Sequence, residues 1–157
     1  MKKIILFIVI AGFISLFSNQ VQAQQYKNAF GVRLGSYNGV NFKTFLTDKN
    51  ALDFNLSFRS NDGVKYVRVT GLYEVHGPVS DLQGLLWYYG GGASIGSYKY
   101  RGTDGELMFS IDGVLGLDYK FTGAPINLAL DWRPNFRLTP NADVLAGDVG
   151  LSVRFTF

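Results

Sequence analysis

Cysteine is absent from the 157-residue sequence, and histidine occurs only once, as His76. Without cysteine the chain has no disulfides, thiol nucleophiles, cysteine-based zinc sites or lipid anchor on an N-terminal cysteine. Charged residues are also scarce, at 17% against 47% hydrophobic residues, and this balance excludes an intrinsically disordered polymer. The length predicts a single domain, because most domains contain about 100–150 residues.

The N-terminal segment has the three-part pattern of a secretory signal peptide. Lys2 and Lys3 precede a predominantly apolar run at residues 4–17, which is followed by polar residues and by Val21-Gln22-Ala23. A membrane-spanning helix is the alternative, but it needs about 20 apolar residues, more than this run provides. We therefore expect residues 1–23 to be a signal peptide cleaved after Ala23, and residues 24–157 to form the mature domain.

The formal net charge of +3 belongs largely to this signal, because Lys2 and Lys3 leave with it. Thirteen basic and twelve acidic residues remain in the mature domain, and they form no basic tract. A nucleic-acid partner is therefore not predicted, since such partners are recognised by clustered positive charge.

Alternation of apolar and polar residues with period two dominates the mature sequence, whereas no stretch repeats apolar residues at helical spacing over three turns. The sequence therefore predicts an all-β fold with eight strands. Gly90-Gly91-Gly92 predicts a bulge or a close-packed bend, and Pro134 predicts a local irregularity because proline cannot donate to a strand ladder. The clearest strands are expected at 52–59, 109–121, 126–137 and 149–157, with four others at about 29–36, 40–47, 65–76 and 84–96.

In each clear strand one face is almost entirely apolar and the other face carries charge. Two architectures share this pattern: a soluble barrel or sandwich with the apolar face inside, and a membrane barrel with that face toward lipid. Of the 25 charged residues in the mature domain, fourteen fall on polar strand faces: Arg33, Lys43, Asp53, Arg59, Arg68, Glu74, Asp112, Asp118, Lys120, Asp131, Arg133, Arg137, Asp148 and Arg154.

Aromatic residues near the strand ends favour the membrane barrel. Phe121, Trp132, Phe136, Phe155 and Phe157 match the aromatic girdles that anchor such barrels at the membrane interfaces. Strands of about 9–11 residues also match a tilted crossing of the hydrocarbon layer. Side chains nearly fill the interior of an eight-stranded barrel, so charges inside it must be paired. We expect this lumen network to contain Asp112, Asp118, Lys120, Asp131, Arg133, Arg137 and Arg154.

The export signal, the eight alternating segments and a last strand ending Val153-Arg154-Phe155-Thr156-Phe157 resemble small bacterial outer-membrane β-barrel proteins of the OmpA/OmpX type. The resemblance implies an eight-stranded antiparallel transmembrane β-barrel surrounded by outer-membrane lipid and lipopolysaccharide. It also implies that the barrel assembly machinery recognises the C-terminal strand ending in Phe157. The stretches Asp131-Trp132-Arg133-Pro134 and Gly39-Val40-Asn41-Phe42 further resemble uncharacterised barrel proteins of Bacteroidota.

The resemblance also implies that both termini lie in the periplasm. Turns near 47–51, 77–83 and 122–125 are then periplasmic, and loops near 36–39, 60–64, 97–106 and 138–147 face outward. Tyr98, Tyr100 and Arg101 are candidates for surface recognition, because tyrosine and arginine in loops supply contact area and hydrogen-bond donors. An ordinary solvated hairpin tip is the alternative reading of this loop.

Catalytic and metal-binding patterns are weak. His76 could serve as a general base beside Ser80 or Asp81, as in the outer-membrane lipid A deacylases and palmitoyltransferases that share this architecture. The catalytic residues of those enzymes lie near the outer leaflet, whereas His76 is expected in a turn at the opposite rim, so a structural histidine is favoured. Asp112, Asp118 and Asp131 alternate with basic residues, which favours salt bridges over a metal site. No catalytic residue, metal or cofactor is predicted.

The sequence thus predicts a monomeric integral outer-membrane barrel that is not an enzyme and has a structural or surface-interaction role in the cell envelope. Two alternatives stay open. One is a narrow pore or small-ligand-binding barrel, and the other is a lipid-A-modifying enzyme.

Overall fold

The computed structural model describes residues 26–157 apart from 62, 80, 101 and 103, and the side chains of residues 61 and 100 are also outside the description. The expected signal peptide, residues 1–23, therefore lies outside the described residues. Within them, no helix is long and apolar enough to cross a bilayer.

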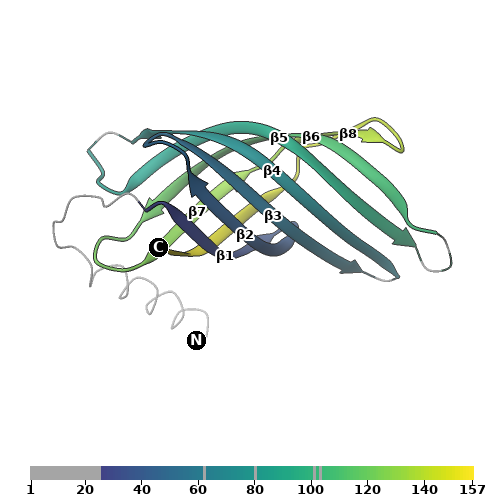
Figure 1. Ribbon diagram of the computed structural model, residues 1–157. Coiled ribbons are helices and arrows are strands. Elements are labelled where there is room, and N and C mark those ends of the chain that lie inside the picture. The colour runs from purple at the N-terminus through teal and green to yellow at the C-terminus, as the bar shows by residue number, and fades with distance from the viewer. Residues whose placement is uncertain (1–25, 62, 80, 101, 103) are drawn as a thin grey trace, which may run out of the picture.

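In the described part of the chain, ten β-strands form one antiparallel sheet, which closes into a barrel because β5 pairs with β6 as well as with β4 (Figure 1). Two positions of the barrel are each filled by two short strands. β7 and β8 lie end to end along β6, and in the next position β10 pairs with β7 and β9 pairs with β8. Eight strands therefore surround the axis, and the predicted all-β, eight-stranded antiparallel barrel is confirmed. The bounds are β1 (Asn28–Gly35), β2 (Asn38–Phe45), β3 (Asn50–Asn61), β4 (Val64–Pro78), β5 (Leu85–Tyr100), β6 (Glu106–Lys120), β7 (Ile126–Trp132), β8 (Asn135–Thr139), β9 (Asp143–Leu145) and β10 (Val149–Thr156).

The segment 126–137, expected as one strand, is divided at Arg133-Pro134 into β7 and β8. Pro134 lacks the N–H that a continuous ladder requires, although its carbonyl still accepts a hydrogen bond from the Gly113 amide at 2.8 Å. The segment 138–147, expected as an outer loop, contains the β8–β9 hairpin. The irregularity predicted at Pro134 is therefore present, and it separates two strands.

The triple glycine in β5 forms a close-packed segment and not a bulge, because the pairing of β5 with β4 and β6 shows no register shift there. A Cβ atom at Gly90 would lie 2.0 Å from the Tyr73 carbonyl oxygen, and one at Gly92 would lie 1.9 Å from the Gly71 oxygen. Glycine is thus required because neighbouring backbone occupies the space of a side chain.

The apolar faces point outward and the polar faces point inward, the reverse of a soluble domain. On β10, Val149, Leu151, Val153 and Phe155 are exposed, whereas Ser152, Arg154 and Thr156 are buried. Among the described residues, a small buried apolar cluster consists of Leu72, Tyr88, Val114 and Ala129, and Ala29, Phe45, Ala51 and Met108 are buried apart from it. The exterior is therefore built for an apolar surrounding and the interior for polar contacts.

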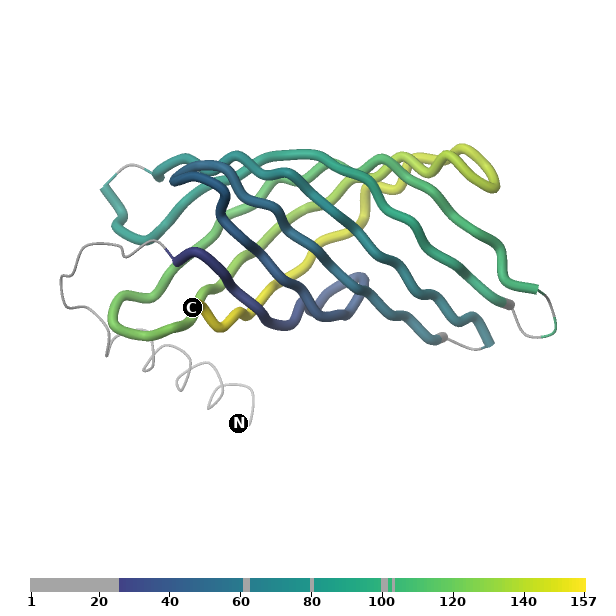
Figure 2. The backbone as a smooth tube through the Cα atoms, viewed as in Figure 1, coloured from purple at the N-terminus to yellow at the C-terminus, as the bar shows by residue number. Residues whose placement is uncertain are grey.

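The two ends of the barrel differ. Both described termini lie at one end, the termini end, where the Asn28 amide donates to the Phe157 carbonyl at 3.0 Å. At the opposite end, the far end, β3 to β6 extend well beyond the turn that joins β1 and β2 (Figure 2). The wall is therefore lower at residues 36–37 than it is along β4 and β5.

Candidate functional site

Eleven charged side chains are buried among the residues that the structure describes, most of them on strands whose alternate residues point to the barrel axis. Five are basic and six are acidic, so the charges nearly balance. They are Arg33, Lys43, Asp53, Arg68, Glu74, Asp112, Asp118, Asp131, Arg133, Asp148 and Arg154. We call these residues the lumen network.

Lys43 joins opposite walls of the barrel. Its Nζ atom lies 2.7 Å from Oε2 of Glu74 and 3.2 Å from Oδ2 of Asp118, and it stands 4.3 Å from the centre of the Tyr88 ring. Lys43 is on β2 and Asp118 is on β6, and three barrel strands separate them on either side. The contact between Lys43 and Asp118 therefore spans the interior from one wall to the opposite wall.

Arg154 on β10 makes a second connection across the interior. Its Nη2 donates to Oδ2 of Asp53 on β3 at 3.0 Å, and its other nitrogens donate to Asn41 at 3.2 Å and Asn127 at 3.0 Å. The guanidinium is fully buried, and hydrogen bonds to three separate strands satisfy its donors.

Asp131 is the centre of a third group. It accepts hydrogen bonds from Arg33 at 2.7 Å, from both donor nitrogens of Arg133 at 2.9–3.0 Å, and from the Tyr88 hydroxyl at 2.9 Å. Arg33 also donates to Asp148 at 3.0 Å. Paired guanidinium and carboxylate groups of this kind hold charge in an interior that would otherwise exclude it.

Arg68 and Asp112 form the group nearest the far end. They are ion-paired between β4 and β6, and Arg68 Nε also donates to Ser94 Oγ on the intervening strand β5 at 2.8 Å. Ser110 lies 3.0 Å from Ser94 and completes the group. The lumen network therefore continues from Lys43 to the base of the far end.

Five of the seven residues expected in the lumen lie in this network: Asp112, Asp118, Asp131, Arg133 and Arg154. Two do not. Lys120 donates at the termini end to the carbonyl oxygens of Phe121 and Ala124, at 2.8 and 2.5 Å. Arg137 pairs at 3.2 Å with Asp143, whose side chain is half exposed. Both occupy the ends of strands, where a long side chain reaches a turn or solvent more easily than the interior.

Six members of the network were not singled out from the sequence, namely Arg33, Lys43, Asp53, Arg68, Glu74 and Asp148. Their signal was present, because all six fall on polar strand faces. What the sequence did not contain was the pairing across the barrel, which depends on how the strands are staggered on closure.

His76 is buried on the inner face of β4, and the expectation of a rim turn at this position is wrong because β4 continues to Pro78. Its ring stacks on Tyr88 at 5.0 Å, and Nε2 lies 3.4 Å from Lys43 Nζ. Of its proposed catalytic partners, Ser80 lies outside the described residues. The neighbours of the imidazole that the structure describes form part of the lumen packing.

Each of the three aspartates considered as a metal cluster has its own cation. Asp112 pairs with Arg68, Asp118 with Lys43, and Asp131 with Arg33 and Arg133. Across the part of the chain that the structure describes, no group of three or more histidine, aspartate or glutamate side chains is arranged to hold a metal ion. The aspartates therefore act as partners of buried cations.

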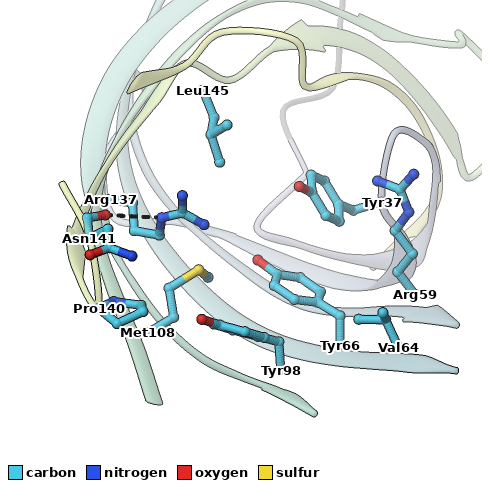
Figure 3. A pocket seen from close by; sticks show the side chains of 10 residues that line it. All are labelled: Tyr37, Arg59, Val64, Tyr66, Tyr98, Met108, Arg137, Pro140, Asn141 and Leu145. Carbon is cyan, nitrogen blue, oxygen red and sulfur yellow. Dashed lines mark hydrogen bonds between the residues drawn. The ribbon is translucent and has the colours of Figure 1, made fainter. Parts of the chain in front are cut away.

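Above the lumen network, at the far end, lies a cavity of about 500 Å³, which we call the far-end cavity (Figure 3). Two of its lining residues are arginines and none is acidic, while three are tyrosines. The lining comprises Tyr37, Arg59, Val64, Tyr66, Tyr98, Met108, Arg137, Pro140, Asn141 and Leu145.

Of the three residues expected in a recognition loop, the structure places Tyr98 elsewhere. It lies on β5, since that strand continues to Tyr100, and its hydroxyl is hydrogen-bonded to Glu106. Tyr98 lines the far-end cavity, as Figure 3 shows. Tyr100 is the last residue of β5 with a side chain outside the described set, and Arg101 also lies outside it.

A second cavity of about 320 Å³ adjoins the first and shares Tyr37, Arg59 and Leu145 with it. It lies where the wall is low. The β2–β3 ladder ends at Phe58, so residues 59–61 of β3 pair only with β4, and β9 pairs only with β8. We call the gap between the free edge of β3 and the free edge of β9, on the far-end side of residues 36–37, the notch.

Glycine at position 116 makes room for Tyr88 inside the barrel. A Cβ atom there would lie 2.6 Å from Cζ of Tyr88 and 2.7 Å from the Leu130 carbonyl oxygen. We expect Gly116→Ala to lower the free energy of unfolding by about 1–3 kcal/mol through overpacking. Urea unfolding of the protein in lipid vesicles measures this, with Gly147→Ala as control because a Cβ there meets nothing within 4 Å. Equal stability of the two variants would contradict the expectation.

These features define a closed eight-stranded barrel with an apolar exterior and an ion-paired interior, the class to which outer-membrane barrels belong. The N-terminal β-barrel domain of Pseudomonas aeruginosa OprF is similar, with a TM-score of 0.68 and 20% identity over 85% of this chain and 100% of that one. Neisserial surface protein A (NspA) gives a TM-score of 0.57 and 14% identity, over 83% and 93%. Neither a protein-family model nor a curated protein sequence matches the chain. The structural likeness establishes the fold.

Proposed function

We propose that the protein is a non-enzymatic integral protein of the bacterial outer membrane, with a closed lumen and a structural or surface-interaction role in the envelope. The observation that carries this proposal is the ion pair between Lys43 and Asp118, 3.2 Å long, which joins opposite walls. A barrel held shut across its width is suited to anchoring a surface and not to passing solutes.

The same contact argues against the narrow pore. Lys43, Glu74 and Asp118 are each at most 1% exposed, and Arg154 and Asp53 fill the neighbouring cross-section. An ion passing through this section would have to break several buried ion pairs, each of which leaves uncompensated charge when it is opened.

Planar-bilayer recording tests the closed lumen. We expect the refolded wild-type protein to give no single-channel openings, because the buried ion pairs of Lys43 with Glu74 and Asp118 cross the lumen. The double variant Lys43→Ala/Asp118→Ala removes the contact across the barrel. Its ion conductance is the reference with which that of the wild-type protein is compared. Steady openings of uniform size in the wild-type protein would refute the proposal.

Enzymatic modification of lipid A receives no support from the described contacts. The imidazole of His76 packs between Phe45 and Tyr88, at 4.9 and 5.0 Å between ring centres, inside the lumen. A catalytic base must reach the proton that it removes, and this ring is enclosed by the barrel wall. Lipid A profiles of cells expressing wild-type protein and His76→Ala would be identical under the proposal, and an acyl-chain change dependent on His76 would overturn it.

The proposed location rests on the apolar outer face together with the export signal expected at residues 1–23. In this proposal lipid and lipopolysaccharide surround a monomeric barrel, and the barrel assembly machinery recognises the strand ending in Phe157. Membrane fractionation followed by gel electrophoresis with and without heating tests the location, because folded barrels migrate differently from unfolded chains. Recovery of the folded protein in the soluble periplasm would exclude it.

A further inference from the structure

We propose that the far-end cavity binds an amphipathic anion, a phosphate or carboxylate group borne on an apolar body, with its charge held by Arg59 and Arg137. The site lies beyond the ion-paired part of the lumen, and the proposed function assigns it no ligand. The volume of about 500 Å³ falls within the range of small-molecule sites.

The charge of the lining selects an anion. Arg59 and Arg137 stand on opposite sides of the cavity in Figure 3, and no acidic residue lines it. Arg59 stacks its guanidinium over Tyr37 at 5.6 Å, and no carboxylate among the described residues forms an ion pair with it. Arg137 donates from Nε to the Asn141 carbonyl oxygen and from Nη2 to Asp143, both at 3.2 Å, which leaves its Nη1 group without a partner among the described residues. Both guanidinium groups thus keep donors for a ligand, in contrast to those of the lumen network.

The remaining lining selects an apolar body for that anion. Tyr37 and Tyr66 pack against each other at 5.2 Å between ring centres, and Tyr98 and Met108 continue the same surface. Figure 3 shows the hydroxyl groups of Tyr37 and Tyr66 directed toward the cavity, whereas the Tyr98 hydroxyl is hydrogen-bonded to Glu106. Aromatic and thioether groups pack well on apolar ligand surfaces, while hydroxyl groups add donors for the anionic head.

The notch gives such a ligand a sideways route. It is bounded by the free edges of β3 and β9, and the adjoining cavity of about 320 Å³ lies between them. Apolar side chains stand exposed beside these edges: Phe58, the last β3 residue paired with β2, is 49% exposed, and Val144 on β9 is 65% exposed. A lipid at this level could place its anionic head in the cavity while its chains remain outside the wall.

Calorimetric titration of the protein in phosphatidylcholine nanodiscs tests the site, with empty nanodiscs as reference and n-hexyl phosphate, inorganic phosphate and 1-hexanol as probes. We expect hexyl phosphate to bind at least about tenfold more tightly than either fragment, since both the charged hydrogen bonds and the apolar contact contribute. In Arg59→Gln/Arg137→Gln this affinity should fall by about tenfold or more. Equal binding of hexyl phosphate and hexanol would overturn the proposal.

The matched control is Lys65→Gln/Lys99→Gln, which removes the same charge from the same end. Lys65 and Lys99 pair across β4 and β5, are exposed on the outer face and do not line the cavity. An affinity loss as large in this variant as in the arginine variant would show that general surface charge, and not the cavity, attracts the anion. Heat-modifiable migration establishes that each variant is folded before titration.

A third variant separates a membrane lipid from a soluble ligand. Gly147 lines the notch cavity, and a Cβ atom there meets nothing within 4 Å, so Gly147→Trp is chosen to place a large side chain at the notch. Native mass spectrometry counts phosphatidic acid retained from mixed nanodiscs. A loss of retained lipid with hexyl phosphate binding intact assigns the ligand to the leaflet. Retention of neither lipid nor hexyl phosphate by the wild-type protein would refute the site.

Discussion

Replacing Lys43 with methionine is expected to lower the free energy of unfolding by about 3–5 kcal/mol, the cost of leaving buried carboxylates without their cation. Lys43 lies within 4 Å of Glu74, Asp118 and Asp53, and all four side chains are at most 1% exposed. Methionine keeps the length of the side chain, so the loss reports charge more than volume. Urea titration in lipid vesicles, followed by tryptophan fluorescence, measures the change.

Two variants establish the cause of that loss. Lys65→Met removes an exposed lysine from the outer face and should change the stability by less than about 0.5 kcal/mol. The double variant Lys43→Met/Glu74→Gln removes one charge of each sign and should recover part of the stability lost in Lys43→Met, since interacting residues are not additive. A Lys43→Met protein as stable as the wild type would show that the ion pairs contribute nothing to the closed barrel.

Placing arginine on the apolar outer face should have the second large effect. Leu130 is 52% exposed and lies in a row with Leu117 and Leu151 on the neighbouring strands. In a bilayer Leu130→Arg should cost about 2–4 kcal/mol, because the guanidinium would enter the hydrocarbon layer. Equilibrium unfolding from vesicles of defined thickness measures this cost.

The rim supplies the control for that experiment. Leu46 is 57% exposed in the turn between β2 and β3 at the termini end, where arginine should cost only about 0–1 kcal/mol because it lies near the interface. Equal costs at Leu130 and Leu46 would show that this face does not lie in the hydrocarbon layer. The experiment therefore tests the membrane orientation independently of the lumen network.

The number of barrel strands and the direction of their faces could be predicted, because a wall between lipid and a polar interior imposes alternation at every crossing. The strand extensions at the far end could not be predicted, because the alternation that reveals the other strands is missing there. Residues 97–100 of β5 are Ser-Tyr-Lys-Tyr, a sequence typical of a loop. A strand that extends beyond the apolar outer face of the barrel has no apolar side from which it can be predicted. Tyr98 was consequently placed in a loop when it lines a cavity.

The residues that face the lumen could be predicted more readily than the ion pairs that they form with one another. Asp118 and Lys120 share one face of β6, but Asp118 meets Lys43 of β2 whereas Lys120 turns to the carbonyl of Ala124. Which of these occurs depends on the height of each residue along the axis and on the stagger of distant strands. Neither quantity is contained in the alternation of a single segment.

The pairing of β1 with β10 has a consequence for how the molecule assembles. It places Ala29 opposite Thr156, so the ladder joins residues from the two ends of the chain and closes only after the last strand has arrived. Arg33 and Arg154 lie on these two strands, and their carboxylate partners lie on β3, β6, β7 and the segment before β10. We therefore expect the charges of Arg33 and Arg154 to stay hydrated during assembly and to lose their water when the barrel closes.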